Sequence, residues 1–435
     1  MPKISKRNHT AATGSYRFGD FELSPSDRRL TRRGKTIRQT PKSFDALLLF
    51  VRNADRLVRR DEMVETLWPD AHVTDANLTN LIVGLRKLLG RRSIQTVSKF
   101  GYRFSLPVMG EPGVDPGVYR RFAEAKGLAT VRSLQSMSEA RDLLSWCVAE
   151  DPQFATAWAW LGRTYRFLEK FEGRPAITLE LAQAALRRAL AIDPQLACAH
   201  HFYTQLQIDL GQARDAAVRL VRRVAGRRGD TDDFAGLVHA LRFSGLLDQS
   251  VAAHVRATTL DPTMVTSVPH THFLRCDYAA TLETYGQTRY YLDAAAWAAL
   301  GETHRAGRLL EERLASQHLS PLMSGLLASL LAVLRDRRDD AVSMIRGMQI
   351  EREPEVLFYM SRHLAMAGDA TGAARMVARA REEGLTSSTT LERDDAFASV
   401  RKTTAFQREI REAIVNERLT LSELERAGLR RGLGE

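Results

Sequence analysis

The chain has 435 residues and a formal net charge of +11, and hydrophobic residues make up 44% of it. This length is enough for two or three domains, each with an apolar core of its own. The cysteines Cys147, Cys198 and Cys276 are odd in number and far apart, which excludes a disulfide scaffold and favours free thiols in a reducing cytoplasm.

The positive charge is concentrated in the N-terminal part of the chain. Residues 1–108 hold 21 lysines and arginines against 10 acidic residues, an excess equal to the charge of the whole chain. A local positive field favours a polyanionic partner, most simply nucleic acid. An acidic membrane surface is the competing partner, but it usually requires a basic amphipathic helix or a lipid anchor.

No segment is expected to cross a membrane. The longest apolar run, Pro321 to Leu334, is shorter than the roughly 20 residues that a bilayer requires, and it predicts a buried helix. The start of the chain has basic residues but no apolar stretch, so it does not predict a signal peptide. We therefore expect a cytoplasmic protein.

The chain begins with a predicted disordered basic arm, residues 1–15, and short strands follow. Apolar and polar residues alternate in YRFGDFELSP, and RRLTRRGKTIRQ predicts two strands that turn at Gly34, so we expect three strands in all. A first helix begins at Thr40-Pro41, because threonine caps helices and proline favours the first helical position. The segment RRDEMVETLW predicts a second helix.

A third helix is predicted by DANLTNLIVGLRKLLG, with Thr74 or Asp75 as its cap. Its apolar stripe consists of Leu78, Leu81, Ile82, Leu85, Leu88 and Leu89. The opposite face carries small neutral residues, and positive charge gathers at the C-terminal end. The segment SIQTVSKFGYRFSL then predicts a hairpin with a basic tip.

Three helices closed by a hairpin form a winged helix-turn-helix. The stretches LVRRDEMVETLW, LRKLLG and QTVSKFGYRF, in this order and spacing, resemble the OmpR/PhoB-type winged-helix DNA-binding domain. The resemblance implies an α+β domain over residues 16–107. It also implies that the helix from Asp75 to Leu89 enters the major groove and that the hairpin from Lys99 to Phe104 reaches the adjacent minor groove.

The open face of the third helix suits base recognition. Asparagine can pair with adenine, and the methyl groups of threonine and valine suit the thymine methyl. Many members of the family carry arginine where this helix has Val83 and Gly84, so we predict an A/T-leaning site. The alternative is an ordinary amphipathic helix with a solvated polar face, which the charge distribution disfavours. The residues expected on DNA are Asn77, Thr79, Asn80, Val83, Arg86 and Lys87.

A second set of residues is expected on the wing and the DNA backbone: Trp68, Thr74, Arg91, Arg92, Ser98, Lys99 and Arg103. Two interpretations of Trp68 stay open. Its indole N–H meets a phosphate, as the resemblance implies, or its ring covers the core. Arg103 either touches the backbone or pairs with a local carboxylate. The turn from Pro69 to Val73 lies where relatives touch RNA polymerase, a partner implied by the resemblance alone.

After a predicted linker, residues 108–118, nearly every segment has helical period. Asp-Pro pairs recur at Asp151, Asp193 and Asp261, and two glycines of the region, Gly211 and Gly245, are 34 residues apart. A 34-residue helix-turn-helix period with W-x-x-L-G-x-x-Y is the tetratricopeptide (TPR) pattern. The first repeat fits this pattern only if the eight residues FEGRPAIT are inserted.

We therefore predict an all-α TPR-like solenoid over residues 119–415, followed by a C-terminal tail or helix, residues 416–435. The pattern is clear for residues 140–262 and indistinct for residues 263–385, where helices are expected without a clean period. Stacked pairs bury a shared core and leave a groove. The balanced charge of this part suits a protein or peptide partner better than DNA.

The sequence contains no catalytic constellation. Gly34-Lys35-Thr36 ends like a phosphate loop, but Arg29 stands where the first glycine is required. His270, His272 and Cys276 are close in sequence, yet a zinc site needs a fourth ligand, so surface or helix-terminal histidines are the preferred interpretation. We expect no enzyme activity, no cofactor and no metal.

These features predict a one-component transcription regulator of HilA-like architecture. Its winged helix would bind double-stranded promoter DNA. Its solenoid would bind a protein or peptide, sense an effector, or form a homodimer. Only 15 residues precede Tyr16, so no receiver domain and no control by aspartyl phosphorylation are expected. The alternative is a TPR scaffold that a non-specific basic module localises to nucleic acid.

Overall fold

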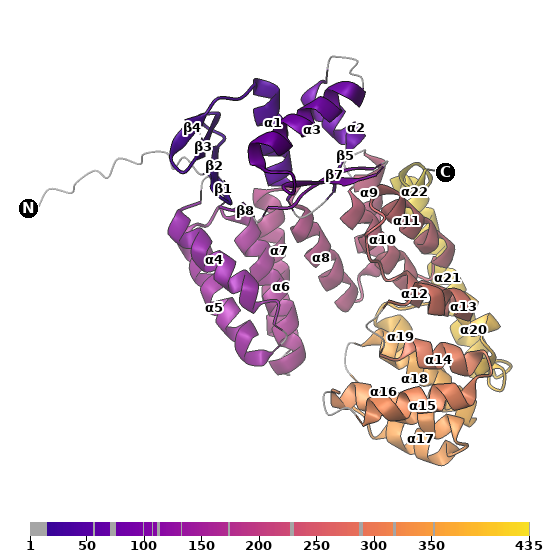
Figure 1. The fold of residues 1–435 in the computed structure, drawn as a ribbon. Coiled ribbons are helices and arrows are strands. Elements are labelled where there is room, and N and C mark those ends of the chain that lie inside the picture. Colours follow the sequence, from indigo (N-terminus) through magenta and orange to yellow (C-terminus); the bar gives the residue numbers. More distant parts are fainter. Residues whose placement is uncertain are drawn as a thin grey trace, which may run out of the picture. The chain divides into compact units, whose positions relative to one another are not determined.

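The computed structural model describes residues 15–54, 57–69, 75–98, 100–106, 108–110, 114–131, 133–172, 175–226, 230–286, 290–315, 319–350 and 353–434. The chain forms two compact units, the first ending at Ala199 and the second beginning at His200. The first unit contains an α+β domain and the first helices of an all-α region, and the second contains the remaining helices (Figure 1). The predicted basic arm lies outside the described residues, apart from Ser15.

In the residues that the structure describes, the α+β domain contains eight short strands and three helices. The strands are β1 Tyr16–Phe18, β2 Phe21–Ser24, β3 Arg29–Arg32, β4 Lys35–Ile37, β5 Leu57–Arg59, β6 Ile94–Val97, β7 Gly101–Phe104 and β8 Val108–Met109. The helices are α1 Pro41–Arg52, α2 Arg60–Leu67 and α3 Asp75–Leu89. One antiparallel sheet has the order β4-β3-β2-β1-β8 and the other the order β5-β7-β6. The predicted winged helix-turn-helix is confirmed.

Two local predictions are confirmed at the start of this domain. Arg33 and Gly34, between β3 and β4, both have positive φ (50° and 78°), as a two-residue type I′ hairpin requires. The hydroxyl of Thr40 accepts a hydrogen bond from the Ser43 N–H at 3.2 Å, and Pro41 begins α1. Both features are encoded locally, so sequence alone could identify them.

The predicted strand count and the predicted linker are wrong. Four strands precede α1, and β5 connects α1 to α2. Val108 and Met109, inside the predicted linker 108–118, pair with β1, and Asp115 caps the helix that begins at Pro116. Gly110 follows the end of β8 and Pro116 begins α4, so these two residues mark a strand end and a helix start rather than a linker.

The first unit continues with two antiparallel helix pairs. Their helices are α4 Pro116–Leu128, α5 Leu134–Glu150, α6 Ala155–Glu172 and α7 Pro175–Ile192, each packed on the next. The predicted eight-residue insertion lengthens α6 and α7 to 18 residues each. Gly162 of the W-x-x-L-G pattern permits their close packing, because a Cβ there would lie 2.6 Å from Cγ of Leu186.

The second unit is a stack of helix pairs. Its helices up to residue 382 are α8 Ala197–Asp209, α9 Ala213–Ala225, α10 Thr231–Phe243, α11 Leu247–Leu260, α12 Val268–Leu274, α13 Tyr278–Thr284, α14 Leu292–Ala299, α15 Thr303–Leu314, α16 Pro321–Leu334, α17 Arg338–Arg346, α18 Pro354–Ala367 and α19 Ala370–Glu382. The predicted buried helix coincides with α16. The predicted TPR-like solenoid is confirmed as a fold, and its regularity extends further than the sequence indicated.

The same turn joins the two helices of every pair from α8 to α19. Its residue with positive φ is, in order, Gly211, Gly245, Cys276, Gly301, Asp336 and Gly368. In each turn, the next residue's N–H donates to the carbonyl four residues before the left-handed residue, at 2.7–2.9 Å. This is a Schellman-type helix ending. The repeat therefore continues through residues 263–385, where it was indistinct because the spacing varies and two turns lack glycine.

The Asp-Pro pairs form a second recurring turn. Asp151, Asp193 and Asp261 each accept, through Oδ1, a hydrogen bond from the backbone N–H two residues later, at 2.9–3.0 Å. The aspartate thereby closes an Asx turn after the second helix of a pair. The recurrence of the dipeptide reflects the recurrence of this geometry.

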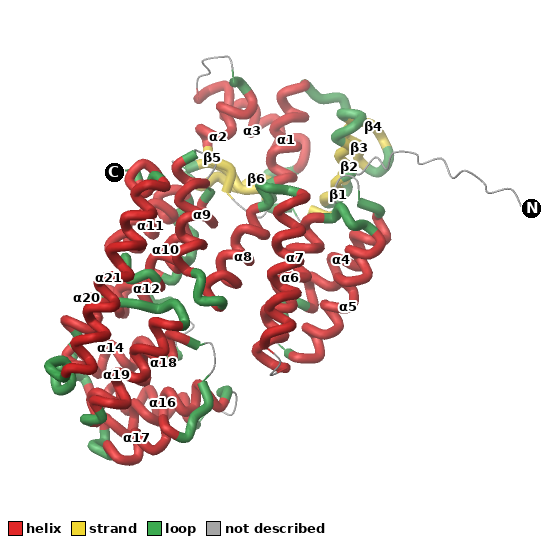
Figure 2. The backbone as a smooth tube through the Cα atoms, turned by 180° about the vertical axis from the view of Figure 1, so that it is seen from behind, coloured by secondary structure: helices red, strands yellow, loops and turns green. Residues whose placement is uncertain are grey.

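The C-terminal segment is part of the stack, so the predicted boundary at residue 415 is wrong. Residue 415 lies within α21 Thr404–Ala427, which follows α20 Ser388–Arg393 and precedes α22 Leu429–Leu433. Helix α21 packs on α9 and α19 (Figure 2). Helix α22, labelled in Figure 1, packs on α9 and α11. Where a solenoid repeat ordinarily touches only its neighbours, this unit joins its first and last pairs.

A direct backbone contact also joins the first and last helix pairs of the second unit. A Cβ on Gly384 would lie 2.7 Å from Cα of Gly211, so the two glycines permit the turn after α19 to touch the turn after α8. Further along, the Thr386 N–H donates to the Phe243 carbonyl at 3.0 Å.

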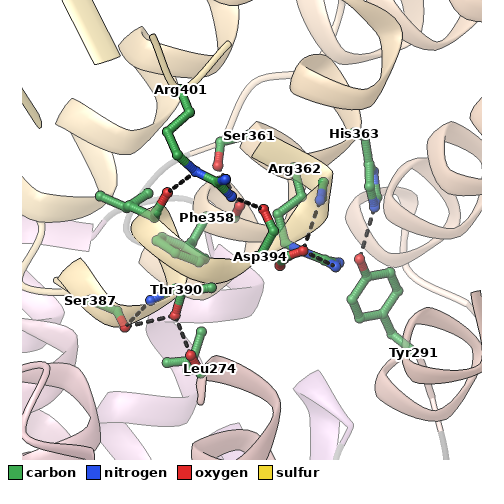
Figure 3. Close-up of polar contacts among 12 residues, drawn as sticks. Leu274, Tyr291, Phe358, Ser361, Arg362, His363, Ser387, Thr390, Asp394 and Arg401 are labelled. Atoms are coloured by element: carbon green, nitrogen blue, oxygen red, sulfur yellow. Dashed lines mark hydrogen bonds and ion pairs between the residues drawn. The ribbon is translucent and has the colours of Figure 1, made fainter. Parts of the chain in front are cut away.

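Several polar side chains are buried inside the second unit and bond to one another there (Figure 3). Arg362 Nε donates to Asp394 Oδ2 at 2.6 Å, and both side chains are almost fully buried. His363 lies between the hydroxyls of Tyr291 and Ser329, at 2.8 and 2.9 Å. Burial, together with the nearby Arg362 guanidinium, lowers the pKa of His363 to about 3. This interior is therefore held by specific polar contacts as well as by apolar packing.

Among the described residues, no helix combines the length and apolarity needed to cross a membrane.

Candidate nucleic-acid interface

Helix α3 has a buried apolar face and, on its opposite side, an exposed polar face. Leu78, Ile82 and Leu85 are buried in the domain core. The predicted base-reading residues Asn77, Thr79, Asn80 and Val83 are all exposed, as is Lys87. Val83 exposes 42% of its surface, which is high for a valine and leaves an apolar contact surface among polar groups. The structure therefore places five of the six predicted residues on open surface of one helix.

The face is held in place by α1. Helix α1 packs against α3, and its Leu47 and Phe50 are fully buried. The ring centroid of Phe104, on β7, lies 6.3 Å from that of Phe50. The apolar stripe of α3 thus packs on a continuous core, which fixes the direction of its polar face.

The sixth residue, Arg86, turns toward the wing instead. Its Nε and Nη2 donate to the Ile94 carbonyl at 3.0 and 2.8 Å, and Nη2 also donates to the Thr96 hydroxyl at 2.6 Å. This fork ties α3 to β6 and sets the distance between helix and wing. Its expected contact with DNA stays a prediction, and in the structure the guanidinium already has these partners within the protein. Sequence reasoning missed Thr96, which only the strand register brings opposite Arg86.

The wing is formed by β6 and β7, with Val97 opposite Gly101. Gly101 is required there, since a Cβ would collide with the Val58 carbonyl of β5. Ser98 is exposed at the turn, and Arg103 is half-buried between neighbouring strands, opposite Gln95. Lys99, at the predicted tip, and Thr74, at the predicted cap, lie outside the described residues.

Exposed cations flank the C-terminal end of α3. Lys87, Arg91 and Arg92 are exposed, and none of them forms an ion pair within the described residues. Two arginines in the turns of the larger sheet differ. Arg28 pairs with Asp45 at 2.6 Å and Arg33 with Asp20 at 2.9 Å. The cations beside α3 are therefore uncompensated within the described residues, as are the exposed Lys35 and Arg38 at the end of the larger sheet.

Trp68 occupies the end of α2. Its half-buried ring packs against the domain core, and Lys42 Nζ lies 5.6 Å from the ring centroid. The Lys42 ammonium also donates to the Leu67 carbonyl. The ring does cover the core, as one interpretation required. The phosphate contact stays a prediction, and Lys42 is a nearby cation that the sequence analysis did not single out.

The candidate metal residues do not converge. His270 Nδ1 lies 3.2 Å from both Glu355 Oε1 and the Tyr359 hydroxyl. Cys276 occupies a helix-pair turn, where burial raises the pKa of its thiol to about 11. Within the described ranges, no group of three or more histidine, cysteine or acidic residues is placed to hold a metal ion.

The first helix pair carries a cleft of about 670 Å³ between the start of α4 and the end of α5. Arg121 lies over the Trp146 ring, with its Cζ 3.9 Å from the centroid. The other lining residues include Glu124 and Glu150. The volume is in the range of small-molecule sites.

Comparison with known proteins adds to this geometry. The family model described as "Transcriptional regulatory protein, C terminal" matches residues 34–104. The chain is 33% identical over 96 residues to the transcriptional regulator HilA of Salmonella typhi, covering 21% of this chain and 17% of that protein. It is 30% identical over 99 residues to the transcriptional activator CadC of Escherichia coli strain K12, covering 21% and 19%.

Among solved structures, the chain is similar to the DNA-binding domain of E. coli CadC. The identity is 29%, the match covers 23% of this chain and 100% of that one, and the TM-score is 0.22. The match spans less than a fifth of the length of HilA and of CadC.

Proposed function

Because residues 34–104 form an OmpR/PhoB-type DNA-binding domain of transcriptional regulators, we propose that this protein is a sequence-specific transcription regulator. In this proposal α3 lies in the major groove of promoter DNA, where Asn77, Asn80 and Val83 meet base edges. The wing lies in the neighbouring minor groove.

One observation carries the proposal. The exposed residues of α3 from Ala76 to Gly84 are uncharged, whereas Lys87 and Arg91, at and beyond its C-terminal end, are exposed cations with no ion pair among the described residues. Phosphates attract cations at the rim of a groove, and base edges require neutral hydrogen-bonding groups at its centre. A surface that binds nucleic acid by charge alone would not need this division.

We further propose that the helix pairs make the protein a one-component regulator that works in the cytoplasm. The stack would bind a protein, a peptide, an effector or a second copy of the chain, and occupancy would change how two winged helices are spaced on DNA. RNA polymerase is the proposed partner of the segment from Pro69 to Val73. A stack ligand that leaves DNA affinity, oligomeric state and transcription unchanged would contradict this part.

The DNA-binding proposal is tested with the full chain on promoter DNA from its own locus and on random DNA, across a salt series. We expect a specificity ratio of about a thousand or more at physiological salt. Replacing Lys87 with alanine should weaken binding to both duplexes and reduce the slope of log K against log salt by about one.

The competing function is a TPR scaffold localised by a non-specific basic module. Equal and steeply salt-dependent binding to both duplexes would favour this scaffold. The absence of binding to either duplex at low salt would contradict DNA binding altogether.

A further inference from the structure

Gly84 lies at an unexpected position in α3. It is an interior residue of the helix, one turn after Asn80 and three residues before Lys87, and it is exposed. Glycine in a helix interior disfavours the helix by roughly fivefold relative to alanine. A glycine there requires a reason, and two kinds are available: close packing within the protein or close approach of a partner.

Packing within the protein does not account for Gly84. A Cβ built at this position meets no described atom within 4 Å, and φ of Gly84 is not positive. Gly162 in α6 differs, because a Cβ there would lie 2.6 Å from Cγ of Leu186 and 3.0 Å from the Ala182 carbonyl oxygen. Packing within the protein accounts for glycine at that position and does not account for it at Gly84.

The neighbours of Gly84 indicate the partner. Asn80 and Lys87 are the exposed residues one turn before and one turn after it, and Val83 adjoins it. Arg86 turns away to β6, so its side chain does not cover the gap. The result is a patch of bare helix backbone in the middle of the face that the proposed function directs toward base pairs.

We infer that Gly84 is a specificity-determining residue at which the α3 backbone approaches the base-pair edges of the major groove. This inference rests on the proposed function and deepens it. The missing side chain lets the helix lie deeper in the groove, so that the short side chain of Asn80 reaches a base edge. A methyl group at position 84 would hold the helix away, and hydrogen bonds weaken steeply with distance and misalignment.

The test replaces Gly84 with alanine in the full chain. A duplex is first selected from a random library by the wild-type protein, and both proteins are then measured on this duplex and on random DNA. We expect G84A to bind the selected duplex at least about tenfold more weakly, with binding to random DNA changed less than about twofold. Hydrogen exchange of the α3 amides should slow by roughly fivefold, because alanine stabilises the helix relative to glycine.

The matched control is Gly127→Ala. Gly127 is the penultimate residue of α4, and a Cβ there also meets no atom within 4 Å. This variant should stabilise its own helix and leave binding to both duplexes unchanged. A second variant, Gly84→Ser, should weaken selected binding at least as much as alanine does, which separates bulk at this position from helix propensity.

Three results would overturn the inference. Equal binding of the selected duplex by G84A and wild type would show that the backbone does not approach the bases. Unchanged DNA binding with lost transcription would place a protein, not DNA, against Gly84. Failure of the wild-type chain to select any sequence would remove the proposed function itself, and this outcome is distinguishable because it does not involve the variant.

Discussion

The winged helix and the second unit differ in whether they bury charged side chains. In the described part of the winged helix, the buried polar side chains are two serines, Ser24 and Ser93. Its ion pairs lie at the surface; the Arg33–Asp20 pair exposes 78% and 40% of the two side chains. In the second unit, the Arg362–Asp394 pair exposes only 3% and 2%.

This difference follows from what each part must specify. A small domain with a continuous aromatic and aliphatic core can leave its cations outside, where they remain free to meet an anionic partner. A stack of similar helix pairs has many near-equivalent packings, and buried pairs with fixed geometry distinguish among them. That a buried pair serves specificity rather than net stability is a hypothesis for this protein, and the following predictions test it.

The largest effect is expected from breaking the buried pair. Arg362→Met leaves the Asp394 carboxylate buried without its cation, which should cost about 3–5 kcal/mol of unfolding free energy. Chemical denaturation of the full chain, with a probe in the second unit, measures this loss. Adding Asp394→Leu to the same protein should recover much of it, and a double variant as unstable as the single one would contradict the account.

A smaller loss of unfolding free energy is expected from a substitution at the contact between the first and last helix pairs. Gly384→Ala combines a positive φ of 99° with a collision against the Gly211 backbone, so it should cost more than about 1 kcal/mol. Gly368→Ala is the matched control, since its φ is 90° but a Cβ there meets nothing within 4 Å. Equal destabilisation by the two variants, measured by thermal unfolding, would show that this contact contributes nothing.

The second unit should also lose stability in mild acid because of His363. Its pKa is about 3 in the folded protein and about 6.5 in the unfolded chain. The favourable contribution is therefore complete above pH 6.5 and is lost as the pH falls toward 3, at up to about 1.4 kcal/mol per pH unit. His363→Gln should make the melting temperature depend less on pH between pH 6.5 and 5. If the melting temperature of the variant falls with pH as steeply as that of the wild type, the burial of a neutral imidazole would be contradicted.

The smallest effect is expected from an exposed pair of the winged helix. Arg33→Ala removes the pair with Asp20 and should change the unfolding free energy by less than about 1 kcal/mol. The measurement is the same denaturation series with a probe in the winged helix. A loss of unfolding free energy comparable to that of Arg362→Met would contradict the proposed difference between exposed and buried ion pairs.

Local signals made much of the fold predictable from sequence. Thr40-Pro41 and the Arg33-Gly34 turn act through their nearest neighbours, and the three Asp-Pro turns repeat one local geometry. Strand β8 was missed because its pairing with β1 joins residues some ninety positions apart. The later helix pairs were indistinct because Cys276 and Asp336 hold the left-handed turn position that glycine marks elsewhere.

Part of the candidate site was also predictable from the sequence. The exposed face of α3 follows from helical period alone, so Asn77, Asn80 and Val83 could be named without a structure. The orientation of Arg86 could not, since it depends on the register of β6 and β7. Sequence thus identified which face is open but not which side chains already have partners within the protein.

If α3 reads the DNA sequence, the substitution Asn80→Ala should weaken binding to promoter DNA and not binding to random DNA. The measurement is the ratio of dissociation constants of the full-length variant and wild type for promoter DNA and for random DNA, at one physiological salt concentration. We expect the specificity ratio to fall by about five- to a hundredfold while binding to random DNA stays unchanged. An unchanged ratio, or an equal loss on both duplexes, would contradict sequence reading by this helix.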